Sequence, residues 1–129
     1  MKRNNTVLQY ASDRIARKTN IWVSIVSGRQ YGKAEKVRFS MRDFSRYVAR
    51  LDQYDKVVRS ALRDKSFLEI VYEDMDPLLP VIQERLGVEA LKMRSCVRRQ
   101  NPDDWVERFS NPDRVLKALK STKFAVHLR

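Results

Sequence analysis

The segment Ser40–Leu62 reads SMRDFSRYVARLDQYDKVVRSAL and contains the clearest fold signal in the chain. Ser40 followed by Asp43 resembles a capping box, which marks the start of an α-helix. A helix of this length is not stable in water from helix propensity alone, so its apolar face should pack on a sheet or on another helix. The prediction is a helix over residues 41–63, and its apolar side chains recur every three or four residues: Phe44, Val48, Leu51, Tyr54, Val58 and Leu62.

Four further helices are predicted on either side of this segment. One covers residues 5–18, where apolar side chains recur at helical spacing and cations stand near the end. Asp76 and Pro77 begin another, which Gly87 ends. Two short helices follow Asn-Pro pairs, over residues 102–109 and 112–121, with each Asn as the cap. Residues 20–27 fit either a strand or the end of the first helix followed by a loop.

Ser66–Tyr72 is a short apolar, β-branched run that predicts a buried strand. Carboxylates gather at and after its end, where they could perform acid/base chemistry, bind a cation or cap the next helix. Capping is the favoured interpretation. The residues concerned are Glu69, Glu73, Asp74 and Asp76.

The 129 residues carry a formal net charge of +11, and that charge is unevenly distributed. Residues 1–50 hold 12 basic and 3 acidic side chains, residues 51–91 hold 5 and 9, and residues 92–129 hold 10 and 4. Two basic ends that fold toward one place would suit a compact anion such as a nucleotide with several phosphates. The alternative is solvated helix faces that are simply basic. No repeat or linker divides the chain, so residues 1–129 are predicted to form a single unit.

Several classes of protein are excluded by composition. With one cysteine, Cys96, and one histidine, His127, the chain can form neither an internal disulfide nor a Cys/His zinc site, and no metal is expected. No apolar run approaches the roughly 18–20 residues of a transmembrane helix. A secretory signal is excluded because polar residues follow the basic start. His127 is predicted to be a surface residue near a fraying terminus and not a catalytic base.

Two basic segments are candidates for anion binding. Gly28–Lys33 resembles a phosphate-binding P-loop but has three residues between its glycines and lacks the following hydroxyl, so it is interpreted as an ordinary basic turn. Lys92–Gln100 contains several basic residues just before a helix cap, and arginine matches phosphate oxygens in pairs. This run is interpreted either as an anion-binding site or as a solvated basic surface.

The order of motifs resembles the C-terminal half of sulfotransferases of the bacterial and Golgi type. The residues that carry this resemblance are Arg3–Ser12 continuing to Trp22, Phe67–Asp74, Arg98–Pro102 and Phe109–Thr122. The resemblance implies an α/β fold, a partial P-loop NTPase-like sulfotransferase fold that is mostly helical with one or two strands. It also implies transfer of a sulfuryl group from 3′-phosphoadenosine 5′-phosphosulfate to a hydroxyl or amine, in a carbohydrate or lipid acceptor.

By the same resemblance, Arg3 and Ser12 hold the 3′-phosphate of this nucleotide, and Arg98 or Arg99 closes over it. The family places its arginine eight residues before the serine, where this chain has Asn4, so either Arg3 reaches the phosphate or that contact is weakened. The family's loop for the 5′-phosphosulfate is missing, so no catalytic residue is assigned and the chain alone is expected to be inactive. A cytoplasmic location is the default, and a Golgi location would need an upstream anchor.

Two alternatives stand beside this interpretation. A small basic helical protein could bind nucleic acid nonspecifically through its phosphates, although the nucleotide interpretation expects no nucleic-acid partner. The chain could also be a degenerate or purely structural remnant.

Overall fold

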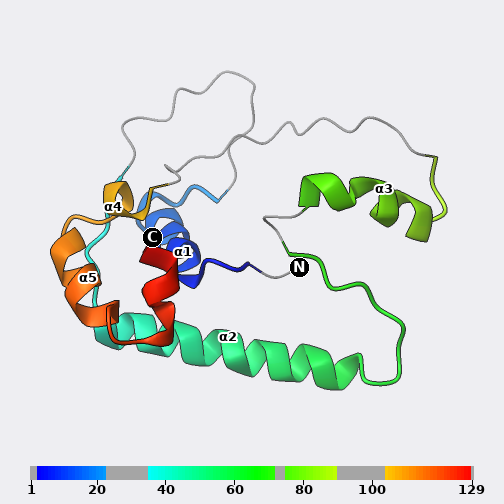
Figure 1. Cartoon of the computed structure of the whole chain (residues 1–129), viewed down its shortest axis with the longest axis horizontal. Helices are drawn as coiled ribbons and strands as arrows, with labels where there is room; N and C mark the ends of the chain where they lie inside the picture. The colour runs from blue at the N-terminus through cyan, green and yellow to red at the C-terminus, as the bar shows by residue number, and fades with distance from the viewer. Residues whose placement is uncertain (1–2, 23–34, 72–74, 90–103, 129) are drawn as a thin grey trace.

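The structure is a computed structural model that describes residues 3–22, 35–71, 75–89 and 104–128 (Figure 1). These residues form five α-helices and one 3-10 helix. The helices predicted over 5–18, 41–63 and 112–121 are confirmed, with their ends moved by one or two residues. The elements are α1 (Thr6–Thr19), α2 (Met41–Ala61), α3 (Met75–Arg85), α4 (Trp105–Arg108), α5 (Pro112–Leu119) and η2 (Lys123–Leu128).

Side-chain caps explain where the helices begin. The Asn5 side chain accepts a hydrogen bond from the Leu8 amide at 2.9 Å, which satisfies one of the free donors at the start of α1. Ser40 accepts from the Asp43 amide at 3.4 Å at the start of α2, as the capping pattern predicts. The helix expected over 102–109 is capped instead by Asp104, and Asn101 lies outside the described residues.

The α/β fold implied by the sulfotransferase resemblance is wrong for the residues that the structure describes. They are mostly helical and contain no sheet. One isolated parallel bridge joins Val37 and Phe109. Ser66–Ile70 has no regular secondary structure, and Val71 directly after it is an isolated bridge residue. The β-branched composition of that run favours extended backbone, but a strand also needs a partner for its amides and carbonyls.

Hydrogen bonds around the bridge hold the segment before α2 against the segment between α4 and α5. The Val37 amide donates to the Arg108 carbonyl at 3.0 Å, and the Ser110 amide donates to the Val37 carbonyl at 3.0 Å. The Asn111 side chain continues this pairing, accepting from the Phe39 amide at 2.7 Å and donating to the Phe39 carbonyl at 3.2 Å. The predicted role of Asn111 as a side-chain cap of α5 is therefore wrong, because its amide group replaces a backbone pair.

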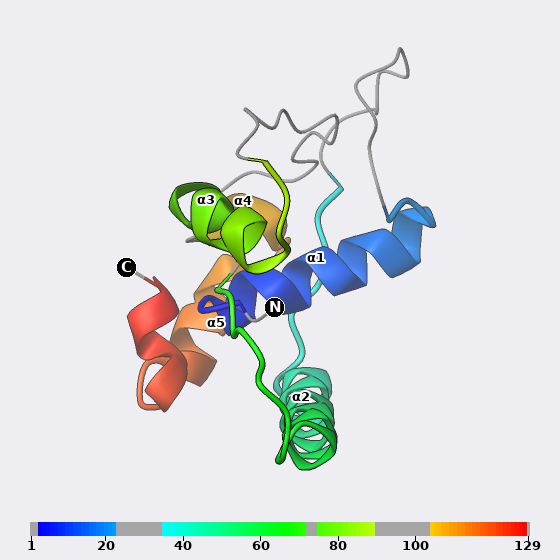
Figure 2. The same ribbon diagram turned by 90° about the vertical axis from the view of Figure 1, so that its right-hand side faces the viewer.

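The core lies where α1, the start of α2, α4 and α5 meet, as Figures 1 and 2 show from two sides. Tyr10 is at its centre, with the rings of Phe44 at 5.4 Å and Tyr47 at 5.5 Å, both edge-on. Such aromatic pairs add about 0.5–1.5 kcal/mol beyond the burial of their area. The other buried residues of the cluster are Val7, Ala11, Ile15, Val37, Phe39, Trp105, Phe109, Val115 and Leu119.

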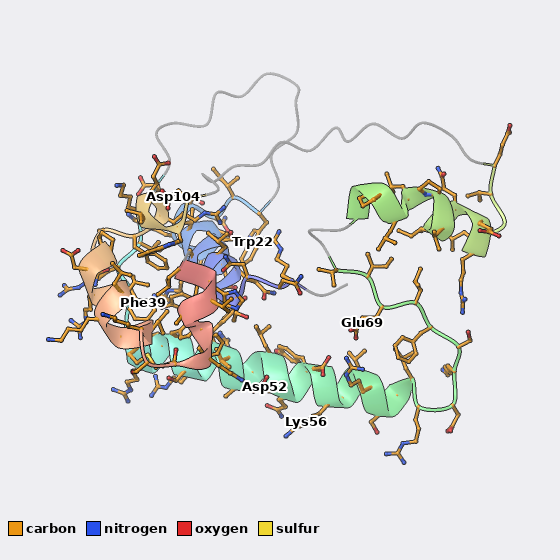
Figure 3. All side chains as sticks on the ribbon, in the orientation of Figure 1. Trp22, Phe39, Asp52, Lys56, Glu69 and Asp104 are labelled. Atoms are coloured by element: carbon orange, nitrogen blue, oxygen red, sulfur yellow. The ribbon has the colours of Figure 1, made fainter. Side chains whose placement is uncertain are left out.

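The apolar face of α2 is buried at one end only. Phe44 is fully buried, but Tyr54 and Val58 are 64% and 53% exposed. Figure 3 shows α2 extending away from the packed end of the molecule, with Asp52 and Lys56 on its outer part. Val48 and Leu51 still pack against the core, so the expectation that the whole stripe packs on a sheet or helix is wrong beyond its first three turns.

The two buried tyrosines predict a loss of stability in alkali. Burial raises the pKa of Tyr47 to about 12, and it raises the pKa of Tyr10 in the same direction. The folded state thus retains these protons where the unfolded chain, with a tyrosine pKa of about 10, releases them. The two protonated tyrosines should therefore contribute fully to the free energy of unfolding below pH 10. That contribution should be lost as the pH rises from 10 to 12. Urea unfolding at pH 9 and pH 11 measures this loss, and the loss should be smaller in Tyr47→Phe than in the wild type by on the order of 1–2 kcal/mol. An equal loss of unfolding free energy in the two proteins would contradict the prediction.

Candidate functional site

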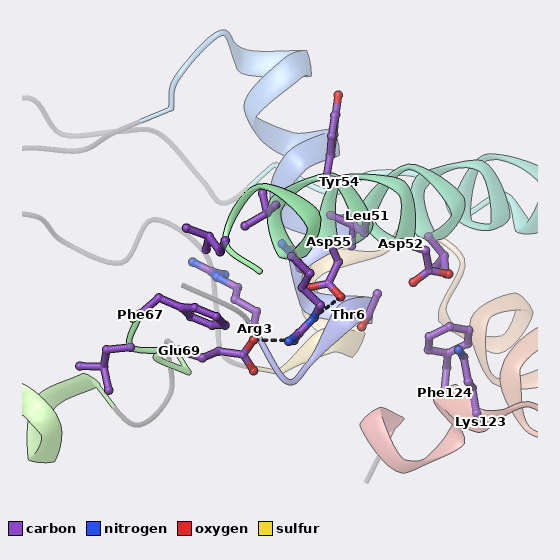
Figure 4. Close-up of a pocket in the computed structure, with 16 residues that line it drawn as sticks. Arg3, Thr6, Leu51, Asp52, Tyr54, Asp55, Phe67, Glu69, Lys123 and Phe124 are labelled. Atoms are coloured by element: carbon purple, nitrogen blue, oxygen red, sulfur yellow. Dashed lines mark hydrogen bonds and ion pairs between the residues drawn. The ribbon is translucent and has the colours of Figure 1, made fainter. Parts of the chain in front are cut away.

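A pocket of about 440 Å³ lies between α2, the N-terminal segment, the extended segment after α2 and the start of η2 (Figure 4). We call it the Arg3 pocket. Its size is within the range of small-molecule sites. Its lining residues are Arg3, Thr6, Gln9, Val48, Leu51, Asp52, Tyr54, Asp55, Val58, Arg59, Leu62, Phe67, Leu68, Glu69, Lys123 and Phe124.

Arg59 connects two walls of the Arg3 pocket. Its Nε lies 2.8 Å from an Asp55 carboxylate oxygen, one turn back on α2, and its Nη2 lies 2.6 Å from Glu69 of the extended segment. Figure 4 draws both contacts as dashed lines. The hydrogen bond that Arg59 donates to Asp55 raises the pKa of Arg59 above its ordinary value, so this residue remains charged. Since all three groups are nearly half exposed, these pairs position the walls more than they stabilise the fold.

The charges of the pocket are mixed. Three carboxylates, those of Asp52, Asp55 and Glu69, stand with three cations in its lining. Arg59 compensates two of the carboxylates, and Lys123 lies 5.3 Å from the centre of the Phe124 ring. Arg3 and Lys123 are the other two cations of the pocket lining.

Ser12 lies in a different place, where α1 faces α4. Its hydroxyl oxygen accepts a hydrogen bond from Nη1 of Arg108 at 2.7 Å, and the same nitrogen lies 3.3 Å from the Leu8 carbonyl oxygen. Arg108 is only 6% exposed. A buried guanidinium must have its donors satisfied, so Ser12 contributes to holding α4 on α1.

Of the predicted phosphate-binding residues, the structure describes Arg3 and Ser12, and it places them at different sites. Arg3 lines the pocket, and Ser12 is not among the residues that line it. Arg98 and Arg99 lie outside the described residues, as does the basic turn Gly28–Lys33. The two basic ends of the chain do converge, because α1 packs against both α4 and η2.

The other sequence candidates have ordinary roles or are not described. Glu69 binds Arg59 and caps no helix, so its favoured interpretation is wrong. Glu73 and Asp74 lie outside the described residues. His127 is half-buried on η2, where its carbonyl oxygen accepts from the Asn5 side chain at 3.4 Å. The chain near His127 is therefore held against the start of α1.

No group of three or more metal-ligating side chains is present among residues 3–22, 35–71, 75–89 and 104–128. Over the same ranges, no helix combines the length and the hydropathy of a membrane span.

The sequence interpretation missed Lys123 and Phe124, which line the Arg3 pocket, and Arg108, which takes Ser12 as a partner outside the pocket. Arg108 had a usable signal, since a cation between Trp105 and Phe109 at helical spacing falls on an apolar face and needs a buried partner. Lys123 and Phe124 had none, because their approach to Arg3 depends on how the two ends of the chain pack.

Comparison of the chain with protein-family models, with curated proteins and with solved structures found no match in any of the three.

Proposed function

We propose that this chain is a sulfotransferase-like protein that binds a sulfate-donor nucleotide, 3′-phosphoadenosine 5′-phosphosulfate or its product, in the Arg3 pocket. One observation carries the proposal. Three separate segments that resemble sulfotransferases, or adjoin such a segment, line the same pocket: Arg3 and Thr6 at the start, Phe67–Glu69 in the middle, and Lys123 with Phe124 near the end. The ligand is inferred from this lining and not from an α/β fold.

The lining offers two kinds of surface that such a nucleotide needs. Phe67, Leu62 and Val58 provide apolar area against which a purine could lie, and Phe67 is 45% exposed. Arg3 and Lys123 supply cations for the phosphates, and hydrogen bonds between ionised partners are stronger than neutral ones. This chain alone is expected to bind the nucleotide without transferring its sulfuryl group to an acceptor.

The net charge of +11 keeps nonspecific nucleic-acid binding as the competing function. Salt separates the two functions, because a polymer that displaces many counterions loses affinity steeply as salt rises. A small ligand held by two cations and an apolar wall should lose far less.

Calorimetric titration with adenosine 3′,5′-bisphosphate tests the proposal. Arg3→Ala and Lys123→Ala should each weaken binding about tenfold, the usual effect of one charge-assisted hydrogen bond. Arg114→Ala is the matched control, because Arg114 is exposed on α5 and is not part of the pocket lining. Equal losses in Arg3→Ala and Arg114→Ala would overturn the proposal. So would the absence of nucleotide binding beside salt-sensitive binding of a random duplex.

A further inference from the structure

A second hollow, of about 460 Å³, lies between α1 and α2 and shares no lining residue with the Arg3 pocket. We call it the α1–α2 groove. It is formed by the middle of one helix and the first turns of the other, so its walls belong to the best-packed part of the molecule. Its lining residues are Tyr10, Asp13, Arg14, Asp43, Arg46, Tyr47, Ala49 and Arg50.

Cations outnumber available carboxylates in the α1–α2 groove. Arg14 and Arg46 form no ion pair among the described residues, and the Arg50 guanidinium lies 5.9 Å from the centre of the Tyr47 ring. Asp13 binds Arg17, outside the groove, at 2.9 Å. Among the described residues, no cation lies within ion-pair distance of Asp43, the other carboxylate of the groove.

The spacing of the arginines on α2 destabilises this helix. Arg42, Arg46 and Arg50 follow one another at intervals of four residues on α2, and like charges at that spacing are destabilising. The interval of four also places Arg46 and Arg50 on the same side of the helix, and both line the groove together with Arg14 of α1. An anion between the helices would convert this repulsion into attraction.

Tyr10 supplies a second, independent observation. Its hydroxyl is buried, and no group in the part of the chain that the structure describes accepts its proton, since the nearby backbone amide of Ser40 can only donate. The residue is 1% exposed, and the charges that act most on its hydroxyl belong to Arg14 and Asp43 of the groove. The hydroxyl end of the ring therefore lies on the groove side of the core. An unsatisfied buried hydroxyl is unfavourable, and an incoming oxygen atom could accept its proton.

We propose that the α1–α2 groove binds a phosphate monoester of a sugar or similar polyol. The phosphate oxygens accept hydrogen bonds from Arg14, Arg46 and Arg50, with the Tyr10 hydroxyl as a further donor. Asp43 accepts a hydrogen bond from a hydroxyl of the ligand, which distinguishes a polyol ester from inorganic phosphate. Guanidinium groups suit this role because their donors match phosphate oxygens in pairs.

Calorimetric titration of the full chain with ribose 5-phosphate tests the proposal, with ribose and inorganic phosphate as the two partial ligands. Ribose 5-phosphate should bind at least tenfold more tightly than either. Arg46→Gln should weaken it at least tenfold and Tyr10→Phe about threefold or more. Arg42→Gln is the matched control, because it removes the same charge from the same helix without being part of the groove lining.

Failure of this proposal is distinguishable from failure of the nucleotide proposal. Arg3→Ala should leave ribose 5-phosphate binding unchanged, since Arg3 does not line the groove. An equal loss in Arg42→Gln and Arg46→Gln would mean diffuse charge attraction and would overturn the site. Unchanged affinity in both Arg46→Gln and Tyr10→Phe would do the same, provided that the thermal unfolding midpoints of the free variants show them to be folded.

Discussion

Phe44→Ala is expected to lower the free energy of unfolding by about 3–5 kcal/mol, the range for truncating a buried aromatic ring. Phe44 is fully buried at the start of α2. Its ring centre lies 5.0 Å from that of Phe124 and 5.7 Å from that of Phe39, so its loss opens a cavity between distant segments. Urea unfolding followed by tryptophan fluorescence measures the change, because Trp105 belongs to the same core.

Val58→Ala on the same predicted stripe is the matched control. Val58 is 53% exposed, so its truncation should cost less than about 0.5 kcal/mol. A loss of several kcal/mol in Val58→Ala, or a loss below 1 kcal/mol in Phe44→Ala, would show that the buried end of α2 has been misassigned.

Asn111→Ala is expected to lower the free energy of unfolding by about 2–4 kcal/mol, because it leaves a donor and an acceptor of a buried residue unpaired. The Asn111 side chain makes hydrogen bonds of 2.7 Å and 3.2 Å with the backbone of Phe39, which is 1% exposed. No other side chain or amide in the described part of the chain replaces these contacts. Thermal and urea unfolding both report the loss.

Asn111→Asp and Ser110→Ala complete this test. Aspartate keeps the acceptor for the Phe39 amide but sets a negative charge against the Phe39 carbonyl, so it should be at least as harmful as alanine. Ser110 is exposed and contributes only its amide to the pairing, so Ser110→Ala should be nearly neutral. A stable Asn111→Asp variant would show that only one of the two hydrogen bonds matters.

The bounds of the helices are predictable because caps are local chemistry. Asn5, Ser40 and Pro112 mark helix starts within a few residues of where the structure has them. Burial is not predictable in the same way, since a stripe such as Phe44 to Val58 states only which side chains share a face. Whether other segments bury that face cannot be read from the helix alone. In α2 only the first turns are buried by other segments.

Asn111 illustrates where local reasoning fails. The Asn-Pro pair predicts a cap, and Pro112 does begin α5. The Asn111 side chain nevertheless binds Phe39, a residue 72 positions away, because that backbone is buried and has no other partner among the described residues. The Asn111 side chain thus pairs with a distant backbone instead of capping its own helix. No pattern in residues 109–114 indicates this.

The candidate sites also contain residues whose roles depend on packing and not on local sequence. Arg3 is found in a pocket, but Ser12 is used by Arg108, and only the packing of α4 on α1 decides this. The arginines of the α1–α2 groove stand on two helices whose sequences are individually unremarkable as surface patterns. They are candidates for a site because they line a groove together with Tyr10, whose hydroxyl is buried. From the sequence alone, Tyr10 is only one more aromatic residue.

The core joins Val7 and Tyr10 of α1 to Val115 and Leu119 of α5, so its two halves are far apart in the order of synthesis. At a translation rate of roughly 5–20 residues per second, α1 leaves the ribosome several seconds before α5 exists. During that interval its apolar face lacks the side chains that cover it in the finished molecule. Folding must therefore be completed after residue 119 has emerged, and the nascent chain, not the folded protein, is the form most exposed to aggregation and most in need of a chaperone.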